Sequence, residues 1–308
     1  MKKHSPTYYI VGSGAIGKAL AVTLQLHDRS VILVRGSVDN LPDQTEKIIL
    51  QDITHGTLEA EIKVTTFSNL SELNGLVVIT TKAFGNDALA ATLQNKKGDF
   101  TLVILQNGLN VEAPFASFSE VYRGVLFATS QVLENGTVSF KSVAPSPVGP
   151  FRSSRTQTAE VVEALHTKYF SFTAEEHIAR IAWEKTITNC AFNTLCPLLE
   201  TDNGIFHRDE KALALASLVI KECVTLAKEY GIVLDESAIQ QRLLLISQRS
   251  DGQLISTYQD LLHRRKTEID SLNLEVARLA AQINKPELTA LTGALGNMIV
   301  IKSETHAS

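Results

Sequence analysis

The 308-residue sequence predicts an α/β domain built on a parallel sheet, followed by an all-helical domain. Its length fits two domains of roughly 100–200 residues each. In the first half, short apolar runs alternate with helix-length stretches, which is the pattern of a parallel sheet with crossover helices. From about residue 174 onward, strand patterns give way to apolar residues at helical spacing. The predicted domains are therefore residues 1–174 and 175–308.

The strands of the first domain are predicted by short, continuous runs of apolar and β-branched residues. They lie at residues 8–11, 30–34, 76–80 and 102–105. An apolar helix pattern that ends at about Leu26 joins the first two strands. Two less regular β-like segments, 124–132 and 136–141, are expected to form an antiparallel edge.

The helices of the second domain are predicted by apolar residues recurring every three to four positions. They cover residues 174–199, 212–230 and 260–283. The second of them stops before Gly231, a residue type favoured just after a helix. The third is closed by Asn284-Lys285-Pro286.

A glycine motif lies between the first predicted strand and the first predicted helix. It is the G-x-G-x-x-G sequence Gly12, Ser13, Gly14, Ala15, Ile16, Gly17. Its glycines allow a tight turn, the approach of a pyrophosphate and close helix–strand packing, and the helix N-terminus holds phosphate. Such glycines also occur in turns without a ligand, but the position after an N-terminal strand favours a Rossmann-type cofactor domain.

The residue after the second strand bears on which dinucleotide binds. NAD sites usually place an acidic residue there, whereas this strand ends in Arg35 and the next acid is Asp39. A guanidinium matches a 2′-phosphate in charge and in its forked donors. The alternative is that Arg35 is a solvated residue at a strand end, and the pattern favours NADP.

A polar stripe interrupts the apolar helix pattern of the second domain. Lys185, Asn189 and Asn193 are four residues apart and therefore share one helix face. Apolar residues such as Ile187 and Phe192 flank them, which is unusual for a solvated face. Two interpretations remain open: the stripe caps neighbouring backbone groups, or it lines a polar cleft.

A second polar cluster follows between residues 256 and 273. Ser256 and Gln259 have the spacing of a capping box, so Ser256 either starts a helix or helps to bind a carboxylate at that helix end. Glu268 lies in a charge-rich segment, where a surface carboxylate is the simplest interpretation.

Composition and charge exclude several functions. The formal net charge is −4, without a long run of either sign, which argues against a nucleic-acid partner. No apolar segment reaches the ~18 residues of a membrane helix, and the N-terminus lacks a signal-peptide core. The three cysteines contain no C-x-x-C pair, which disfavours a disulfide scaffold or a cysteine zinc site. We therefore expect a cytoplasmic protein without a metal, nucleic-acid or membrane partner.

Taken together and in order, the motifs resemble those of the ketopantoate reductases (2-dehydropantoate 2-reductases). The resemblance spans nearly the whole chain. It is carried by the glycine motif, Thr81-Lys82, Gln106-Asn107-Gly108, Trp183 with Lys185, Asn189 and Asn193, Asn203-Gly204, Ser256 with Asp260, and Thr267-Glu268-Ile269-Asp270.

The resemblance implies a substrate cleft between the two domains and a role for each matching residue. Lys185 would be the general acid that protonates the carbonyl oxygen as NADPH delivers hydride, and Glu268 would hold the substrate hydroxyl and orient the lysine. The implied substrate-binding residues are Asn107, Asn189, Asn193, Asn203 and Ser256. The implied cofactor-binding residues are Gly12, Ser13, Gly14, Ala15, Ile16, Gly17, Arg35, Lys82, Asn107 and Glu268. A homodimer is expected from the same resemblance.

Three positions depart from the family pattern. Gln253 replaces a common Asn, Leu274 replaces the glycine that usually follows Asn273, and residues 145–147 lack a histidine pattern. Reduction of 2-dehydropantoate to (R)-pantoate with NADPH, a step toward pantothenate and coenzyme A, is the function that the resemblance implies. The alternatives are reduction of another branched 2-oxo acid, an opine-type dehydrogenase, and a non-catalytic NADP-binding sensor.

Overall fold

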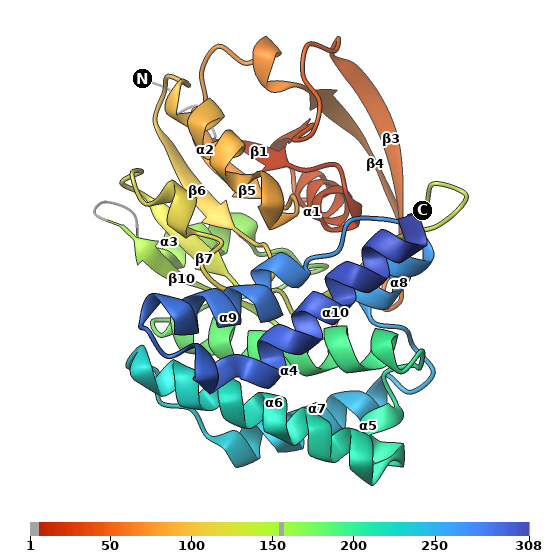
Figure 1. Cartoon of the computed structure of the whole chain (residues 1–308). Coiled ribbons are helices and arrows are strands. Elements are labelled where there is room, and N and C mark those ends of the chain that lie inside the picture. Colours follow the sequence, from red (N-terminus) through yellow and green to blue (C-terminus); the bar gives the residue numbers. More distant parts are fainter. Residues whose placement is uncertain (1–5, 154–156, 308) are drawn as a thin grey trace. The chain divides into compact units, whose positions relative to one another are not determined.

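Contacts between residues divide the chain into two units (Figure 1). The computed structural model describes residues 6–153 and 157–307. The first unit is Met1–Gln106 with Val111–Ile178, and the second is Asn107–Asn110 with Ala179–Ser308. The sequence places one boundary after residue 174. The contacts instead place it after Ile178, in the first turn of a helix, and assign four residues from the first half to the second unit.

The first unit contains a mixed sheet. Within the described residues it has eleven strands, in the order β11-β10-β7-β6-β5-β1-β2-β4-β3-β9-β8. The bounds are β1 Thr7–Val11, β2 Ser30–Val34, β3 Gln44–Asp52, β4 Gly56–Thr65, β5 Gly75–Ile79, β6 Phe100–Ile104, β7 Val121–Gly124, β8 Ala128–Val132, β9 Val138–Ser142, β10 Ser146–Arg152 and β11 Phe172–Ala174.

The centre of this sheet is the predicted Rossmann-type arrangement. The strands β4, β2, β1, β5, β6 and β7 are neighbours in that order, and each pair between them is parallel. From β1 the chain moves to β2 on one side and later returns to β5 on the other, so the strand order reverses at β1. Ligands of such sheets bind outside the carboxyl ends of the strands at this switch point. The glycine motif directly follows β1 and therefore lies there.

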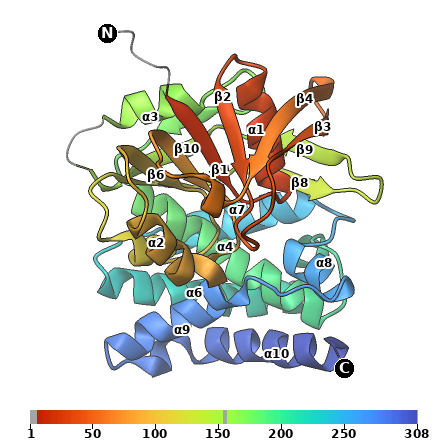
Figure 2. The same cartoon turned by 90° about the horizontal axis from the view of Figure 1, so that it is seen from above.

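Helices cover both faces of the central strands (Figure 2). Ile10 of β1 packs in one core together with α1 (Ala15–Gln25) and α3 (Thr158–Leu165). Tyr9 and Val11 pack in the other core, with α2 (Asn86–Gln94). Successive side chains of a strand alternate between faces, so burial on both faces requires the continuous apolar runs seen in the sequence.

The edges of the sheet were only partly predictable. The two irregular segments form the antiparallel pair β8 and β9, with β8 outermost, which confirms the predicted edge. The long β3–β4 hairpin, at the upper right of Figure 1, was not predicted. Its turn is stabilised by Asp52, whose Oδ1 accepts the backbone N–H groups of Thr54 and His55 at 2.7 and 2.9 Å.

The regular secondary structure of the second unit, in the part that the structure describes, consists of helices. Its helices are α4 Ile178–Leu198, α5 Ile205–Arg208, α6 Glu210–Glu229, α7 Glu236–Arg249, α8 Ser256–Leu262, α9 Asn273–Gln282 and α10 Ala290–Ala307. Residues of α4 such as Ile187 and Phe192 pack in one core with Val219 and Ile220 of α6. Helices α9 and α10 lie side by side (Figure 1). No helix that the structure describes is long and apolar enough to cross a membrane.

The predicted end of α6 is confirmed. Gly231 has φ +74°, its N–H donates to Lys228 O at 3.0 Å, and the N–H of Ile232 donates to Ala227 O at 2.9 Å. This is the pair of hydrogen bonds by which a left-handed glycine closes a helix. The N-terminus of α6 is capped by the side chain of Asp209.

The predicted single helix over 260–283 is wrong. Helix α8 ends at Leu262, a 3₁₀ turn covers Ile269–Ser271, and α9 begins at Asn273. Arg264 takes a left-handed conformation with φ +53°, and the backbone N–H of Arg265 turns back to Asp260 O at 2.7 Å. The side chain of Arg265 also pairs with Asp260 Oδ1 at 3.0 Å. These contacts end the helix and leave Glu268 on the non-helical segment that follows.

Candidate active site

The glycine motif forms a tight turn at the carboxyl end of β1. Gly12 has φ +119°, and a Cβ on Gly17 would lie only 1.9 Å from Gly12 O, so these two positions need glycine. A Cβ on Gly14, in contrast, would meet no atom within 4 Å. The space beside Gly14 is therefore open, next to the first amides of α1, which have no partners within the helix.

Polar side chains follow the two neighbouring strands, and one of them bonds to this turn. Thr80 follows β5, and its hydroxyl donates to Val11 O at 3.0 Å and is 3.2 Å from Gly12 O. Gln106 follows β6 and exchanges two amide hydrogen bonds, of 2.8 and 2.7 Å, with the buried Asn86 of α2. Thr80 and Asn86 were not among the residues predicted from the sequence. Their only signal was a polar residue at the end of an apolar strand or the start of a helix.

Arg35 lies at the carboxyl end of β2, next to the turn. Its backbone N–H donates to Thr65 O at 2.9 Å. Its half-buried side chain makes no hydrogen bond or ion pair with residues 6–153 or 157–307. The next acid, Asp39, accepts the backbone N–H groups of Asn40 and Ser68, both at 2.9 Å. These hydrogen bonds lower the pKa of Asp39 to about 2 and hold its carboxylate against the backbone of the loop.

Lys82 also belongs to the first unit. It follows β5 and precedes the 3₁₀ turn Ala83–Gly85, and its side chain is half-buried. The carboxyl end of β5 adjoins that of β1 in the sheet. The backbone of Lys82 thus lies at the same edge of the sheet as the glycine motif.

In the second unit, three predicted site residues form one hydrogen-bonded group. Lys185 Nζ donates to Asn107 Oδ1 at 2.8 Å. Asn107 Nδ2 donates to Glu268 Oε2 at 3.3 Å. We call Lys185, Asn107 and Glu268 the lysine–amide–glutamate group. It joins an ammonium to a carboxylate through a single amide, whose two ends match the donor on one side and the acceptor on the other.

The segment Asn107–Asn110 is held in the second unit by residues 268–275. Leu109 N–H donates to Ser271 O at 3.0 Å, and Asn110 Nδ2 donates to Glu275 Oε1 at 2.8 Å. Gly108 has φ +106°, and a Cβ there would lie 2.2 Å from Ser271 O. The glycine after Asn107 is therefore required by both its conformation and this close approach.

The orientation of α4 is set by the residue before Lys185. Glu184 is buried, and its carboxylate accepts hydrogen bonds from Arg180 at 3.1 Å and from Arg242 of α7 at 2.8 Å. With Glu184 and Ile187 directed to the interior, Lys185 and Asn189 lie on a half-buried face. The role of Glu184 was not predictable from the sequence, because its partner Arg242 on α7 is far along the chain.

Asn193 connects α4 to the start of α8. Its Nδ2 donates to Asn189 O at 3.0 Å, and its Oδ1 accepts Ser256 Oγ and the Thr257 N–H, both at 3.3 Å. Of the two interpretations of the polar stripe, Asn193 therefore fulfils the first, since it caps backbone groups. Asn189 makes no side-chain hydrogen bond with the residues that the structure describes.

A helix starts at Ser256, as one interpretation of the sequence expected, but without the side-chain contacts of a capping box. Helix α8 begins at Ser256 itself, after Ile255, and no side chain of its own caps it. Gln259 Nε2 instead donates to Leu254 O at 2.9 Å. The cap comes from Asn193, a residue of another helix, which sequence spacing does not reveal. The exposed Ser256 hydroxyl bonds to this asparagine instead of its own backbone.

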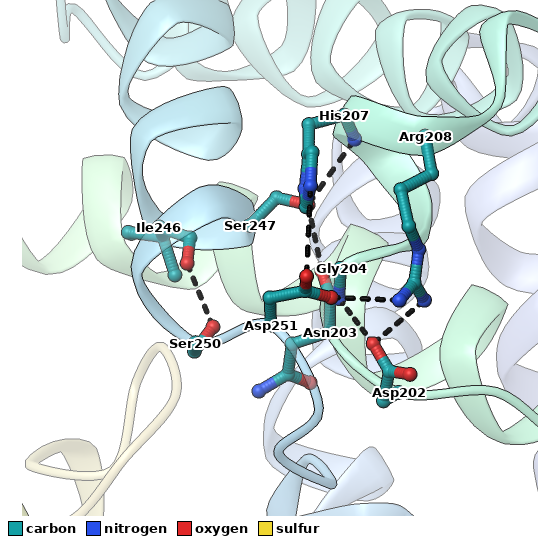
Figure 3. A network of polar contacts seen from close by, with 9 residues as sticks. All are labelled: Asp202, Asn203, Gly204, His207, Arg208, Ile246, Ser247, Ser250 and Asp251. Atoms are coloured by element: carbon teal, nitrogen blue, oxygen red, sulfur yellow. Dashed lines mark hydrogen bonds and ion pairs between the residues drawn. The ribbon is translucent and has the colours of Figure 1, made fainter.

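Asn203 lies apart from the lysine–amide–glutamate group in its hydrogen bonding. It belongs to the loop before α5, beside residues at the end of α7 (Figure 3). Its side chain is buried, and its Oδ1 has no hydrogen-bond partner among the described residues. Its backbone N–H donates to Gln253 O at 2.9 Å.

The departure at Leu274 has a packing explanation. A Cβ on Gly296 of α10 would lie 2.9 Å from Leu274 Cδ2. The small residue on α10 thus leaves room for the leucine on α9. At the departure Gln253, the backbone carbonyl accepts the Asn203 N–H, and many residue types would provide this carbonyl equally well.

Comparison with known proteins agrees with both units. Residues 8–153 match the model of the family Ketopantoate reductase PanE/ApbA, and residues 177–298 match the model of its C-terminal domain. A 2-dehydropantoate 2-reductase of Pyrococcus horikoshii is 26% identical over 90% of this chain and 91% of its own length.

Two solved structures share the fold. A dimeric ketopantoate reductase from Staphylococcus aureus superposes with a TM-score of 0.80 and 18% identity, over 97% of this chain and 99% of that one. A D-mandelate dehydrogenase solved with NADH and anilino(oxo)acetate has a TM-score of 0.82 and 19% identity, with the same coverage. With both of its units matched in order by the family models, the chain belongs to the ketopantoate reductase family of oxidoreductases.

Proposed function

We propose that the protein reduces 2-dehydropantoate to (R)-pantoate with NADPH, and that Lys185 is the general acid. The lysine–amide–glutamate group carries this proposal. An ammonium held at 2.8 Å by an amide that also bonds a carboxylate is suited to delivering a proton in a fixed direction. Membership of the ketopantoate reductase family and the similarity to the Pyrococcus horikoshii enzyme support the choice of substrate.

The first unit fits a nicotinamide dinucleotide. The open space beside Gly14 and the first amides of α1 suit a pyrophosphate. The guanidinium of Arg35, which bonds to no side chain or backbone group among the described residues, suits a 2′-phosphate. We assign Gly12–Gly17, Arg35 and Lys82 to its binding. When bound, NADPH supplies the hydride that adds to the carbonyl carbon.

In this proposal Lys185 donates the proton that completes the reduction. The carbonyl oxygen gains negative charge as its carbon is reduced, and a nearby ammonium both stabilises this charge and protonates the oxygen. Asn107 holds the ammonium through Oδ1, while Glu268 fixes the amide by accepting from Nδ2. We assign Asn189, Asn203 and Ser256 to substrate binding, with the exposed Ser256 hydroxyl at the substrate carboxylate, and Asn193 takes part by holding that hydroxyl at 3.3 Å.

A panel of 2-oxo acids tests the substrate. We expect the oxidation of NADPH, followed by its absorbance, to have the highest kcat/KM with 2-dehydropantoate. The panel includes branched aliphatic acids and an aromatic one, because a protein of the same fold is a D-mandelate dehydrogenase. Turnover of other acids but not of 2-dehydropantoate would support a reductase activity but reject this substrate. NADPH binding without turnover of any acid would favour the sensor.

Arg35→Ala tests the choice of NADPH. A charge-assisted hydrogen bond contributes ~1.5–3 kcal/mol, so the affinity for NADPH is expected to fall roughly ten- to a hundredfold. The affinity for NADH is expected to remain unchanged, because NADH lacks the 2′-phosphate. Dissociation constants for both cofactors, measured by fluorescence titration, check this result.

Arg29→Ala is the matched control. Arg29 precedes β2 as Arg35 follows it, so the two arginines mark opposite ends of one strand. Arg29 lies over the Tyr8 ring at 5.9 Å and is expected to leave both affinities unchanged. Equal losses for NADPH and NADH in Arg35→Ala would show that Arg35 is structural and would remove it from the cofactor site.

The same proposal includes a homodimer in the cytoplasm. The Staphylococcus aureus relative of the same fold is described as dimeric. The three cysteines of this chain are free and buried, which suits a reducing compartment.

A further inference from the structure

Ser247 of α7 differs from an ordinary helical serine. Serine hydroxyls within helices commonly bond to the carbonyl of the preceding turn. Ser250, three residues further on, does this and donates to Ile246 O at 2.7 Å. Ser247 is fully buried. Its hydroxyl instead donates at 2.7 Å to the backbone carbonyl of Asn203, in the loop before α5 (Figure 3).

The hydroxyl of Ser247 is also an acceptor. The backbone N–H of His207 donates to it at 3.2 Å, and His207 Nδ1 lies at the same distance. One buried oxygen thus joins α7 to the residues on both sides of the Asn203–His207 turn. Because the hydroxyl has no exposure to water, its loss leaves Asn203 O without this donor.

The residues around Asn203 are also attached to the segment that follows Ser247 (Figure 3). Asp202 Oδ1 accepts the Gly204 N–H and Arg208 Nη2, both at 2.7 Å. Arg208 Nη1 donates to Asp251 Oδ1 at 2.7 Å. Together with the Asn203 N–H on Gln253 O, these contacts attach the loop to residues 247–253, just before Ser256.

The side chain of Asn203 makes no hydrogen bond with the residues that the structure describes. The residue as a whole is only 6% exposed. Buried amides are normally hydrogen-bonded, and a side chain without such bonds takes its position from its backbone. The Asn203 backbone is held by two hydrogen bonds, of which Ser247 provides one and Gln253 the other.

We propose that Ser247 is a positioning residue for the substrate: its buried hydroxyl sets the Asn203 backbone and thereby the placement of the Asn203 amide. This inference rests on the proposed function, in which Asn203 binds the 2-oxo acid. Ser247 itself touches neither substrate nor cofactor in this role. It acts through the carbonyl of Asn203.

Ser247→Ala and Ser250→Ala make the same chemical change three residues apart, the first within α7 and the second at its C-cap. Ser247→Ala is expected to raise the KM for 2-dehydropantoate about three- to tenfold, the equivalent of one neutral hydrogen bond. Its kcat and its dissociation constant for NADPH are expected to stay within about twofold of the parent protein. Ser250→Ala is expected to change none of these values. An unchanged KM in Ser247→Ala would overturn the proposal.

Asn203→Ala separates this inference from the proposed function. If Asn203 binds substrate, Asn203→Ala raises KM, and adding Ser247→Ala to it raises KM no further. An unchanged KM in Asn203→Ala would reject the role of Asn203 in the proposed function. A raised KM in Asn203→Ala with an additive effect of Ser247→Ala would reject only the positioning role of Ser247.

Ser247→Cys covers the case in which alanine destabilises the helical unit. A thiol has a similar shape to the hydroxyl but is a weak donor. It is expected to raise KM as alanine does, with the melting temperature close to that of the parent. A purely structural role predicts a lower melting temperature together with losses in kcat and NADPH affinity. That outcome would overturn the proposal.

Discussion

Lys185→Ala is expected to lower kcat by about 10²- to 10⁴-fold, the usual effect of removing a general acid. The dissociation constant for NADPH is expected to stay near that of the parent protein, because the glycine motif and Arg35 lie in the other unit. The melting temperature is also expected to change little, since Lys185 is half-buried and α4 is held by Glu184. All three quantities are measured on one purified variant.

Two further lysine variants sharpen this test. Lys185→Arg keeps the positive charge but replaces the ammonium by a guanidinium that does not give up its proton in proteins, so kcat is expected to remain low. Lys221→Ala removes an exposed lysine from α6 of the same unit and is expected to have no effect. Near-normal turnover in Lys185→Ala would reject the proposed mechanism.

Gly108→Ala is expected to have the second largest effect. Alanine is disfavoured at φ +106°, and its Cβ would lie 2.2 Å from Ser271 O, so the segment has to move. Asn107 would move with it and lose its place between Lys185 and Glu268. Since misplacement by about 1 Å can cost 10²-fold in rate, we expect kcat to fall by that order.

Gly56→Ala is the matched control for this glycine. Gly56 also has a positive φ, of +78°, but a Cβ there would meet no atom within 4 Å. This variant is expected to lose about 1 kcal/mol of stability in the β3–β4 turn and to retain its kcat. If Gly108→Ala retained kcat as Gly56→Ala does, the contact between Asn107 and Lys185 would not be needed for turnover.

Much of the fold was predictable because it depends on local patterns. The buried parallel strands appear as continuous apolar runs, and the switch-point turn appears as three glycines after the first of them. Gly231 marked the end of α6 because a left-handed residue is needed there. Each of these signals lies within a few residues of the structure that it produces.

The features that the sequence analysis missed depend on distant partners. The cap of α8 is Asn193, and the partner of Glu184 is Arg242, each about sixty residues away. The break between α8 and α9 arises where Arg265 turns back to Asp260, in a stretch whose spacing alone favours a helix. The positions of Lys185, Asn107 and Glu268 came from the family resemblance, whereas their contact became visible only in the structure.

The segment Asn107–Asn110 determines how the chain can be divided. A cut after Ile178 would produce a C-terminal fragment with all of α4 but its first residue and with every later helix, but without this four-residue piece. Lys185 would then lack its acceptor Asn107, and Glu275 would lack the Asn110 amide. Expressed alone, such a fragment lacks the segment. Mixed with the N-terminal piece, it has to bind the segment as part of a separate molecule. The unit that carries Lys185 is therefore not a separable module, although its helices are contiguous in the sequence.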